Sequence, residues 1–378
     1  MRSPDLSSRA PLKVAVYAGP TGGHLFPAQA FAESFRDRHF GSRLELVTSA
    51  RAKKLVARFP KGLFDGVHYL PDFGLPNRLF SFQSLKPLFL APYLFTRSFF
   101  HLRSFRPDLC VGFGSFVSYP GMRLARLLGI PTLLHEQNQY AGKATRWLVR
   151  HADAVAESFE GTNFSAAARR LYTTGLPLRK LILHGEFHGT RQSDQIRILV
   201  MGGSQGARGL NKAVLNCWST LSDEEKNKFA VTHITGDKEA GSVAERYGEL
   251  GVRSRVYPFY ENMAELFRGS ELAVTRAGAN TLFELAFYGL PAFVVPFPHA
   301  GGHQRLNAQA FARHGALEFH DEDELLGGWL ADKMRGVLEN RGQLESMSVA
   351  MKNLARPKAG DQLVEISLEL LKKHDDRS

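Results

Sequence analysis

The chain has 378 residues, of which 44% are hydrophobic and 22% charged, so it can form a packed core and is neither disordered nor fibrous. At roughly 100–200 residues per domain, its length predicts two domains. The formal net charge of +11 comes from one half of the chain. Residues 1–180 hold 25 basic and 11 acidic side chains, whereas residues 181–378 hold 23 and 26. Such asymmetry is compatible with partners that are nucleic acid, an anionic membrane or a phosphorylated substrate.

The cysteine content excludes a disulfide framework and a zinc site built from cysteine, because the chain has only Cys110 and Cys217. The 14 histidines show no ligand spacing on a helix, so zinc is not expected from the sequence. The first dozen residues lack the apolar run of a secretory signal, and no stretch of about 18 uncharged apolar residues is present. We therefore expect a chain in a reducing compartment that is neither exported nor membrane-spanning.

The same opening unit occurs twice, about 184 residues apart. Residues 12–18 form a short apolar run that leads into the glycine cluster at 19–24 and a helical pattern from Pro27 to Arg36. The run at residues 196–200 leads likewise into the glycine cluster at 202–207 and a helical stretch. This order predicts a strand, a glycine loop and a helix at the start of each half.

Apolar runs that alternate with helical stretches continue through the first half, as at residues 108–111 and 132–134. This is the βαβ rhythm of a parallel sheet covered by helices, so we expect an α/β fold with two doubly wound, Rossmann-like domains. The predicted domains span residues 1–178 and 179–359. An amphipathic stretch predicts a closing helix at about 360–378, and whether this helix packs back on the first domain is left open.

The glycine clusters match neither of the common nucleotide motifs. Neither fits G-x-G-x-x-G, and neither is followed by the Lys-Ser/Thr of a Walker A loop, so a dinucleotide site is disfavoured. Glycines still let a backbone approach phosphate, and the N-terminus of the next helix favours an anion. Glycines that only form tight turns between strand and helix are the alternative at each loop.

A third cluster supports a binding site in the second half. Residues 272–275 predict a strand that ends in a loop of small and polar residues at 276–281, and residues 292–295 predict another that ends at 296–304. In open parallel sheets, ligands lie beyond the carboxyl ends of the strands. Glu284 stands one turn into the helix after the first of these loops, where its carboxylate could accept hydrogen bonds from ribose hydroxyls.

Five motifs in order resemble those of the MurG family, the UDP-GlcNAc:lipid I N-acetylglucosaminyltransferases of peptidoglycan synthesis, which have the GT-B fold and belong to glycosyltransferase family 28. They are GPTGGH at 19–24, GFGSFVS at 112–118, HEQN at 135–138, GGSQGA at 202–207 and the segment from Arg276 through Glu284 to Asn307. The resemblance extends from about residue 12 to residue 310.

This resemblance implies transfer of GlcNAc, with inversion, from UDP-GlcNAc to the 4-hydroxyl of MurNAc in lipid I (undecaprenyl-pyrophosphoryl-MurNAc-pentapeptide), which gives lipid II. On the second domain it implies nucleotide-sugar contacts from Ser204, Tyr260, Ala279, Asn280, Thr281, Leu282, Phe283, Glu284 and Gln304. On the first domain it implies that Thr21, Gly22, Gly23, Asn138 and Arg179 complete the donor site across the cleft. The family usually has a Gln-Gln pair where this chain has His303 and Gln304.

The implied reaction needs a base for the acceptor hydroxyl and stabilisation of the departing diphosphate. His24 is our candidate base, because an unperturbed histidine has a pKa of about 6.5. A role of His24 in capping the next helix or ordering the loop is the alternative, and His135 with Glu136 is a lower-ranked acid/base pair. Backbone N–H groups could stabilise the diphosphate, so no cofactor is expected. The D-x-D pattern at Asp321–Asp323 is interpreted as an acidic helix start, not as a metal site.

A basic and aromatic segment predicts contact with an anionic membrane. No acidic residue lies between Asp72 and Asp108, whereas basic residues there flank many phenylalanines and leucines. Basic side chains beside apolar ones suit an interfacial segment, and we name as membrane residues Phe80, Phe82, Lys86, Phe89 and Arg97. Pro87 and Pro92 lead us to expect two short helical pieces and a loop. The alternative is that the phenylalanines belong to the core of the first domain.

The sequence predicts a peripheral enzyme on the cytoplasmic face of the cell membrane. Nucleic acid is not an expected partner, because no RNA- or DNA-binding module is present. Two other functions remain open: a GT-B glycosyltransferase that acts on a diacylglycerol-type lipid, and a nucleotide-sugar sensor without turnover.

Overall fold

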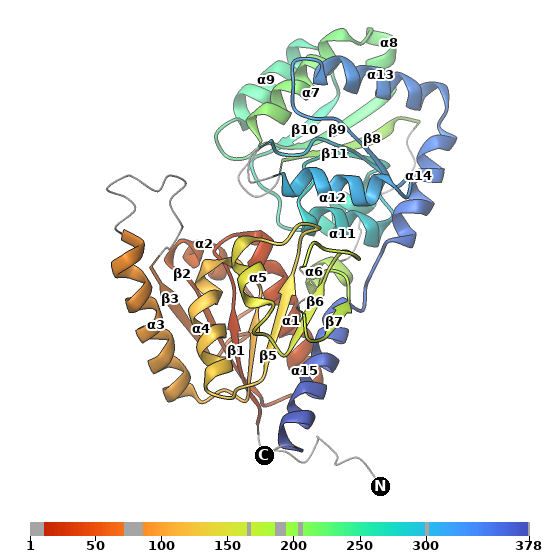
Figure 1. Ribbon diagram of the computed structural model, residues 1–378. Helices are drawn as coiled ribbons and strands as arrows, with labels where there is room; N and C mark the ends of the chain where they lie inside the picture. Colours follow the sequence, from red (N-terminus) through yellow and green to blue (C-terminus); the bar gives the residue numbers. More distant parts are fainter. Residues whose placement is uncertain are drawn as a thin grey trace. The chain divides into compact units, whose positions relative to one another are not determined.

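The computed structural model describes residues 11–71, 86–164, 168–185, 194–202, 207–298 and 302–376, with no side-chain description at 86–89 and 375. The chain divides into two compact units (Figure 1). The first unit comprises residues 1–179 and 358–378, and the second comprises residues 180–357. Each unit is a parallel sheet with helices packed against it, and each is described by itself below.

The first unit is built on a seven-stranded sheet in the order β3-β2-β1-β4-β5-β6-β7, in which every paired strand is parallel. Its central strands are buried on both faces because helices cover both, which explains their almost continuous apolar sequence. The strands are β1 (Lys13–Tyr17), β2 (Arg43–Ser49), β3 (Gly66–Leu70), β4 (Leu109–Gly112), β5 (Thr132–Glu136), β6 (Ala154–Glu157) and β7 (Leu171–Thr173).

Two hydrophobic clusters fill the two faces of this sheet. The helices of the unit are α1 (Gly22–Arg38), α2 (Lys53–Val56) with the preceding turn η2 (Ala50–Ala52), α3 (Lys86–Phe105), α4 (Ser115–Leu127), α5 (Lys143–Leu148) and α15 (Ala359–Asp375). The C-terminal helix α15 packs beside α1, and its Leu363, Val364 and Leu370 join the same core cluster as Val14 and Phe31. The two ends of the chain therefore build one unit.

The second unit repeats the architecture with a six-stranded parallel sheet in the order β10-β9-β8-β11-β12-β13. Its strands are β8 (Ile196–Met201), β9 (Phe229–Ile234), β10 (Ser254–Tyr257), β11 (Leu272–Thr275), β12 (Ala292–Val294) and β13 (Leu317–Phe319). Its helices are α6 (Lys180–Leu183), α7 (Arg208–Thr220), α8 (Asp223–Lys226), α9 (Ala240–Glu249), α10 (Met263–Gly269), α11 (Ala279–Tyr288), α12 (His303–Ala312), α13 (Leu326–Glu339) and α14 (Gly342–Asn353).

The predicted fold class is confirmed, since both halves are doubly wound parallel sheets that open with a strand, a loop and a helix. The start of the first helix was predicted too late: α1 begins at Gly22, and Pro27 lies inside it. Proline at that position costs one backbone hydrogen bond, and burial of the helix face that includes Leu25 and Phe31 compensates for it.

The expectation of two short helical pieces and a loop around Pro87 and Pro92 is wrong for the described part of that segment. Residues 86–105 form the single helix α3. Pro87 lies in its first turn, where the N–H has no partner within the helix in any case. Pro92 removes only one further bond, and Leu94 and Leu102, which are buried against the sheet, hold the rest of the helix in place.

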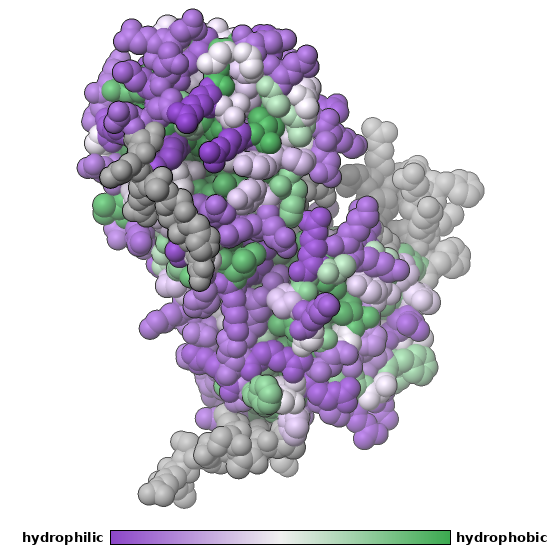
Figure 2. Space-filling view, turned by 180° about the vertical axis from the view of Figure 1, so that it is seen from behind, coloured by the Kyte–Doolittle hydropathy of each residue, from purple (hydrophilic) through white to green (hydrophobic). Residues whose placement is uncertain are grey.

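The surface that Figure 2 shows is mostly hydrophilic, and its apolar residues lie in small groups among polar ones. Within the described residues, no helix has both the length and the apolar character that are needed to cross a bilayer.

Candidate active site

In each unit the strand order reverses at one point of the sheet, and the conspicuous loops follow the strands at that point. The reversal lies between β1 and β4 in the first unit and between β8 and β11 in the second. Such a switch point is where ligands bind in open α/β sheets, because the two following loops leave in opposite directions and open a crevice. The motifs at residues 19–24, 112–118 and 276–284 occupy these positions.

In the first unit, the loops after β1 and β4 lie against each other because Gly19 has no side chain. A Cβ at Gly19 would lie 2.5 Å from Cβ of Ser115, the first residue of α4. Gly114 adopts a φ of +76°, and a Cβ there would lie 3.3 Å from the His24 ring and 3.4 Å from the Thr145 hydroxyl. The imidazole of His24 therefore lies beside the N-terminus of α4.

His24 has one hydrogen-bond partner that fixes its ring: its Nδ1 lies 3.1 Å from Oγ1 of Thr21. Burial lowers the pKa of His24 to about 4. The side chain is therefore neutral at physiological pH. It is also a weaker base than a histidine with the unperturbed pKa that was assumed from the sequence. With Nδ1 turned to Thr21, Nε2 is the atom that could take a proton from a bound hydroxyl.

The first turn of α1 also positions Arg179. The Phe26 ring lies so close to Gly22 that a Cβ there would be 2.9 Å from it. On Phe26, the Arg179 guanidinium carbon lies 3.9 Å from the ring centroid, a cation–π contact. Thr21 and Gly23 are exposed at the same helix end. Four of the five predicted first-unit residues therefore gather at the N-terminus of α1.

The fifth, Asn138, lies in the loop after β5, and Glu136 holds that loop. The buried Glu136 carboxylate accepts hydrogen bonds from the backbone N–H groups of Gln137 (3.1 Å), Asn138 (3.0 Å) and Gly142 (3.3 Å), and from the Asn138 amide (3.3 Å). Burial raises the pKa of Glu136, and hydrogen bonds from Thr145 and from this loop oppose that shift. Glu136 is thus a positioning residue that holds this loop.

His135 is fully buried, so its pairing with Glu136 as acid and base has no geometric support. Its Nδ1 lies 3.1 Å from the Gln137 amide nitrogen, and its Nε2 lies 3.4 Å from both Ser158 Oγ and the Gly175 carbonyl oxygen. Burial lowers its pKa to about 4. His135 is a neutral core residue that ties β5 to its neighbours.

In the second unit, α11 starts directly after β11 and offers its first N–H groups at the switch point. Gly278 is the N-cap, and no side chain caps the helix. The backbone N–H groups of its first turn belong to Ala279, Asn280 and Thr281, and such a helix start suits an anion. Glu284, one turn later, is 7% exposed.

Two of the predicted contact residues in this helix face the core instead. Leu282 is fully buried, and its N–H donates to the Gly278 carbonyl within the helix. Phe283 is also buried, and its ring packs edge-on against Phe311 at 5.5 Å between centroids. A 3.6-residue period places these two side chains on the inner face, so they support the helix and do not reach its exposed end.

Gln304 joins the two loops of the second unit. Its Oε1 accepts hydrogen bonds from the backbone N–H groups of Ala277 (3.1 Å), in the loop after β11, and Phe297 (2.9 Å), in the loop after β12. Asn307, one turn further along α12, donates to the Ala277 carbonyl at 3.1 Å. The Gln304 carbonyl oxygen is therefore used within the protein, where it joins these two loops.

The acidic triplet Asp321-Glu322-Asp323 lies among basic partners. Glu322 forms an ion pair with Arg276, which is only 5% exposed and also donates to the carbonyl oxygens of Val295 and Pro296. Asp321 forms an ion pair with Arg305. Two of the three carboxylates are thus engaged by arginine, which fits a structural role for the pattern. The ion pair and the hydrogen bonds of Arg276 were not predicted from the sequence.

Two predicted donor contacts remain, Ser204 and Tyr260. Ser204 lies outside the described residues. The Tyr260 hydroxyl donates a hydrogen bond to the Glu265 carboxylate at 3.0 Å, and the Tyr260 ring packs against Tyr257, the last residue of β10. Tyr260 is therefore held in the loop after the edge strand β10, not in a loop at the switch point between β8 and β11.

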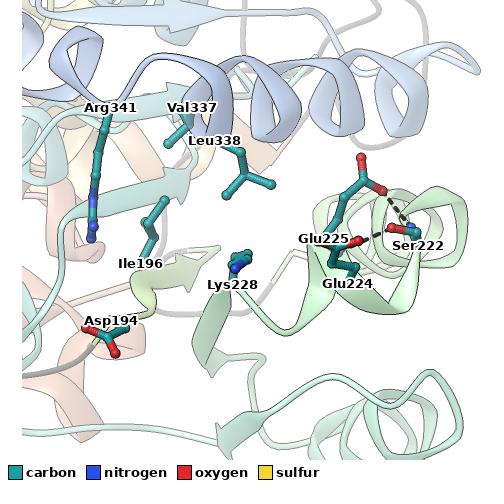
Figure 3. Close-up of a pocket in the computed structure, with 9 residues that line it drawn as sticks. All are labelled: Asp194, Ile196, Ser222, Glu224, Glu225, Lys228, Val337, Leu338 and Arg341. Atoms are coloured by element: carbon teal, nitrogen blue, oxygen red, sulfur yellow. Dashed lines mark hydrogen bonds between the residues drawn. The ribbon is translucent and has the colours of Figure 1, made fainter.

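A cavity of about 360 Å³ in the second unit is not part of either switch point (Figure 3). It lies at the amino end of β8, and Ser222 and Glu225 on its wall are hydrogen-bonded to each other in a capping box at the start of α8. No predicted site residue lines it. The lining residues are Asp194, Ile196, Ser222, Glu224, Glu225, Lys228, Val337, Leu338 and Arg341.

Two doubly wound parallel-sheet units are the architecture of the GT-B fold, and comparison with known proteins agrees with this. Residues 14–157 match the glycosyltransferase family 28 N-terminal domain, and residues 197–363 match the C-terminal domain of the same family. The chain belongs to glycosyltransferase family 28.

The relatives match over nearly their whole length. A UDP-N-acetylglucosamine--N-acetylmuramyl-(pentapeptide) pyrophosphoryl-undecaprenol N-acetylglucosamine transferase of Methylococcus capsulatus is 36% identical over 94% of this chain and 98% of its own. One of the same name from Desulfotalea psychrophila is 32% identical over 96% and 98%. Among solved structures, Acinetobacter baumannii MurG has a TM-score of 0.73 at 27% identity over 95% of this chain and all of its own.

Proposed function

We propose that this protein transfers GlcNAc from UDP-GlcNAc to the 4-hydroxyl of MurNAc in lipid I and so forms lipid II. The observation that carries the proposal is the identity of 36% over 94% of the chain with an enzyme named for this transfer. The motifs at residues 19–24, 112–118 and 276–284 follow strands at the two switch points, which supports the proposal. The reaction breaks the bond between C1 of GlcNAc and the UDP oxygen and forms a bond from C1 to the acceptor oxygen, with inversion.

In this proposal, Nε2 of His24 accepts the proton of the acceptor hydroxyl. Its contact with Thr21 fixes the ring, and burial keeps the imidazole neutral before reaction. A pKa of about 4 makes His24 a modest base, so proton transfer should be late, when the hydroxyl has become acidic through bond formation to C1.

The second unit is proposed to bind the UDP part of the donor. The backbone N–H groups at the start of α11 would donate hydrogen bonds to the diphosphate. These bonds would strengthen as the bond to C1 breaks, because the negative charge on the diphosphate then increases. Glu284 would accept hydrogen bonds from the ribose, and the Gln304 NH₂ group would donate to the sugar. Gly22, Gly23, Asn138 and Arg179 of the first unit are proposed to complete donor recognition. The chain's own N–H groups meet the charge, so we assign no cofactor.

We propose that α3 of the first unit contacts the anionic membrane that holds the lipid acceptor. On the described part of this helix, Tyr93, Phe99 and Phe100 are exposed, and the exposed fraction of Phe100 reaches 64%. Arg97 and Arg103 are exposed on the same helix. Aromatic rings beside cations are what an interfacial segment needs. Phe80 and Phe82 lie outside the described residues, and the side chains of Lys86 and Phe89 are not described.

A single-turnover assay with labelled UDP-GlcNAc tests the catalytic proposal. Lipid I and a diacylglycerol are offered separately, and a disaccharide lipid is expected only from lipid I. Product from diacylglycerol alone would assign the chain to lipid glycosylation, and donor binding without product would make it a sensor.

Co-sedimentation with vesicles tests the membrane proposal. Anionic vesicles at low salt should pellet the wild-type protein, and Phe99→Ser with Phe100→Ser should lower the bound fraction severalfold. Phe40→Ser is the matched control, because Phe40 is fully exposed but follows α1. Equal losses for both variants, or binding that salt does not weaken, would contradict a specific role for α3.

A further inference from the structure

Three side chains capable of binding a metal converge on the first unit, away from the loops at its switch point. Glu45 lies on β2, His68 on the edge strand β3, and His101 on α3. Figure 1 shows α3 lying alongside these two strands. The three residues come from three separate elements, and their convergence is therefore a property of the fold.

The ligand atoms of the cluster point to one place. Glu45 Oε2 lies 2.9 Å from Nε2 of His68 and 2.9 Å from Nε2 of His101, and one ligand atom from each residue lies within 4.8 Å of the other two. The two imidazole centroids are 4.4 Å apart. Gly66, which pairs with Glu45 across the strands, leaves room for the carboxylate, since a Cβ there would lie 3.3 Å from Glu45 Cγ.

One carboxylate and two imidazoles form a known ligand set for zinc, which binds oxygen and nitrogen at about 2.0–2.2 Å. A tetrahedral ion requires ligand atoms to be roughly 3.3 Å apart, so each of the two contacts between Glu45 and an imidazole must lengthen by about 0.4 Å. The His68 side chain is 42% exposed, which allows that adjustment and gives an ion a path from solvent. The fourth position would belong to water.

The surroundings suit an ion at this place as well. The Tyr17 hydroxyl lies 3.3 Å from Nδ1 of His101. It can accept Nδ1–H and so hold His101 in the tautomer that presents the Nε2 lone pair to a metal. Arg43 approaches the other carboxylate oxygen, Oε1, at 3.9 Å, which leaves Oε2 to the imidazoles. Both imidazoles can bind as neutral ligands by moving a proton from Nε2 to Nδ1.

We propose that Glu45, His68 and His101 form a zinc-binding site that fastens α3 to strands β2 and β3. Phe99 and Phe100, beside His101 in the sequence, lie on the exposed side of the same helix. The site thus fixes the helix that presents these rings, and it takes no part in the transfer chemistry.

Zinc binding is measured on the full chain after treatment with a chelator, by competition with a chromogenic chelator and by the visible spectrum with Co²⁺. The wild type should bind one ion per chain and give the intense bands of tetrahedral Co²⁺. His68→Ala and Glu45→Gln should each weaken zinc at least about 10-fold, and Tyr17→Phe, which keeps all three ligands, about 10-fold. His314→Ala, at an exposed histidine of the second unit, should bind as the wild type does.

Hydrogen exchange gives the second readout, with ZnCl₂ added to the chelator-treated protein. Zinc should slow exchange in the residues of α3 in the wild type and leave it unchanged in His68→Ala. The proposal fails if the wild type binds zinc no more tightly than His68→Ala and Glu45→Gln do. It fails equally if bound zinc leaves exchange in α3 unchanged, because the ion then lies elsewhere. Neither readout depends on transferase activity.

Discussion

The two switch points have the same topology but recruit different chemistry. In the first unit, ionisable side chains dominate: His24 lies against two loops, and a buried Glu136 holds the third. In the second unit, the corresponding loops present backbone amides at the start of α11, and the amide side chain of Gln304 joins them. The same topology therefore places an imidazole at one switch point and, at the other, the amides of a helix start beside the Arg276–Glu322 ion pair.

The largest effect should come from His24, because removing a general base costs about 10²–10⁴-fold in rate. We expect His24→Ala to lower the single-turnover rate by that factor and to leave the Kd for UDP-GlcNAc within about twofold. His314→Ala is the control. A folded His24→Ala protein with near wild-type turnover would remove His24 from the base role and leave it as a loop residue.

The next effect concerns stability, since Glu136 accepts several N–H groups of one loop. Glu136→Gln replaces one acceptor oxygen by a donor, so buried N–H groups lose their partner. We expect the free energy of unfolding to fall by about 1–3 kcal/mol in urea titrations. Glu160→Gln, at an exposed position on the next loop, should change it little. If the two variants are equally stable, Glu136 does not hold the loop.

A smaller effect is expected at Gln304, where one carbonyl oxygen joins two loops. Gln304→Ala should raise the KM for UDP-GlcNAc by up to about 30-fold, because the two lost hydrogen bonds of about 1 kcal/mol each held the two loops together. Gln304→Glu keeps the acceptor but adds a negative charge beside the proposed diphosphate. It should retain the stability of the wild type and still bind the donor poorly. Gln309→Ala on the same helix is the control.

The smallest predicted effect is a flat pH profile. A base must be unprotonated to act, and a lowered pKa means that His24 gains its proton only near pH 4. The value of kcat/KM should therefore not fall through His24 protonation between about pH 8 and pH 5. An acid limb centred near the unperturbed histidine value of about 6.5 would show that His24 is not held neutral by burial.

Sequence patterns were sufficient for the sheets because central parallel strands are apolar on both faces. Residues 272–275 were predicted as a strand, and β11 is Leu272–Thr275. The start of α1 and the single helix α3 were missed for one reason. Proline was interpreted as a boundary, whereas burial of Leu25 in α1 and Leu94 in α3 outweighs one lost hydrogen bond.

Within the site, glycine loops could be predicted, but side-chain partners could not. The inward direction of Leu282 and Phe283 follows from the helical period, so assigning the residues of this segment to the faces of a helix would have predicted it. The two amides that Gln304 joins lie 7 and 27 residues away in sequence, so only the folded chain brings them together. The same holds for Glu45 and His101, which are 56 residues apart and could not appear in a search for ligand spacing on one helix.

The return of α15 to the first unit has a consequence for how the protein is made. Leu363, Val364, Ile366, Leu370 and Leu371 complete a core whose other buried residues come from the first 160 positions of the chain. The second unit is continuous in sequence, from Lys180 to Pro357. On the ribosome, the second unit can therefore finish folding while the first still exposes an apolar surface along α1. Because α15 is translated after the second unit, a chain that stops before α15 would lack part of the core of the first unit.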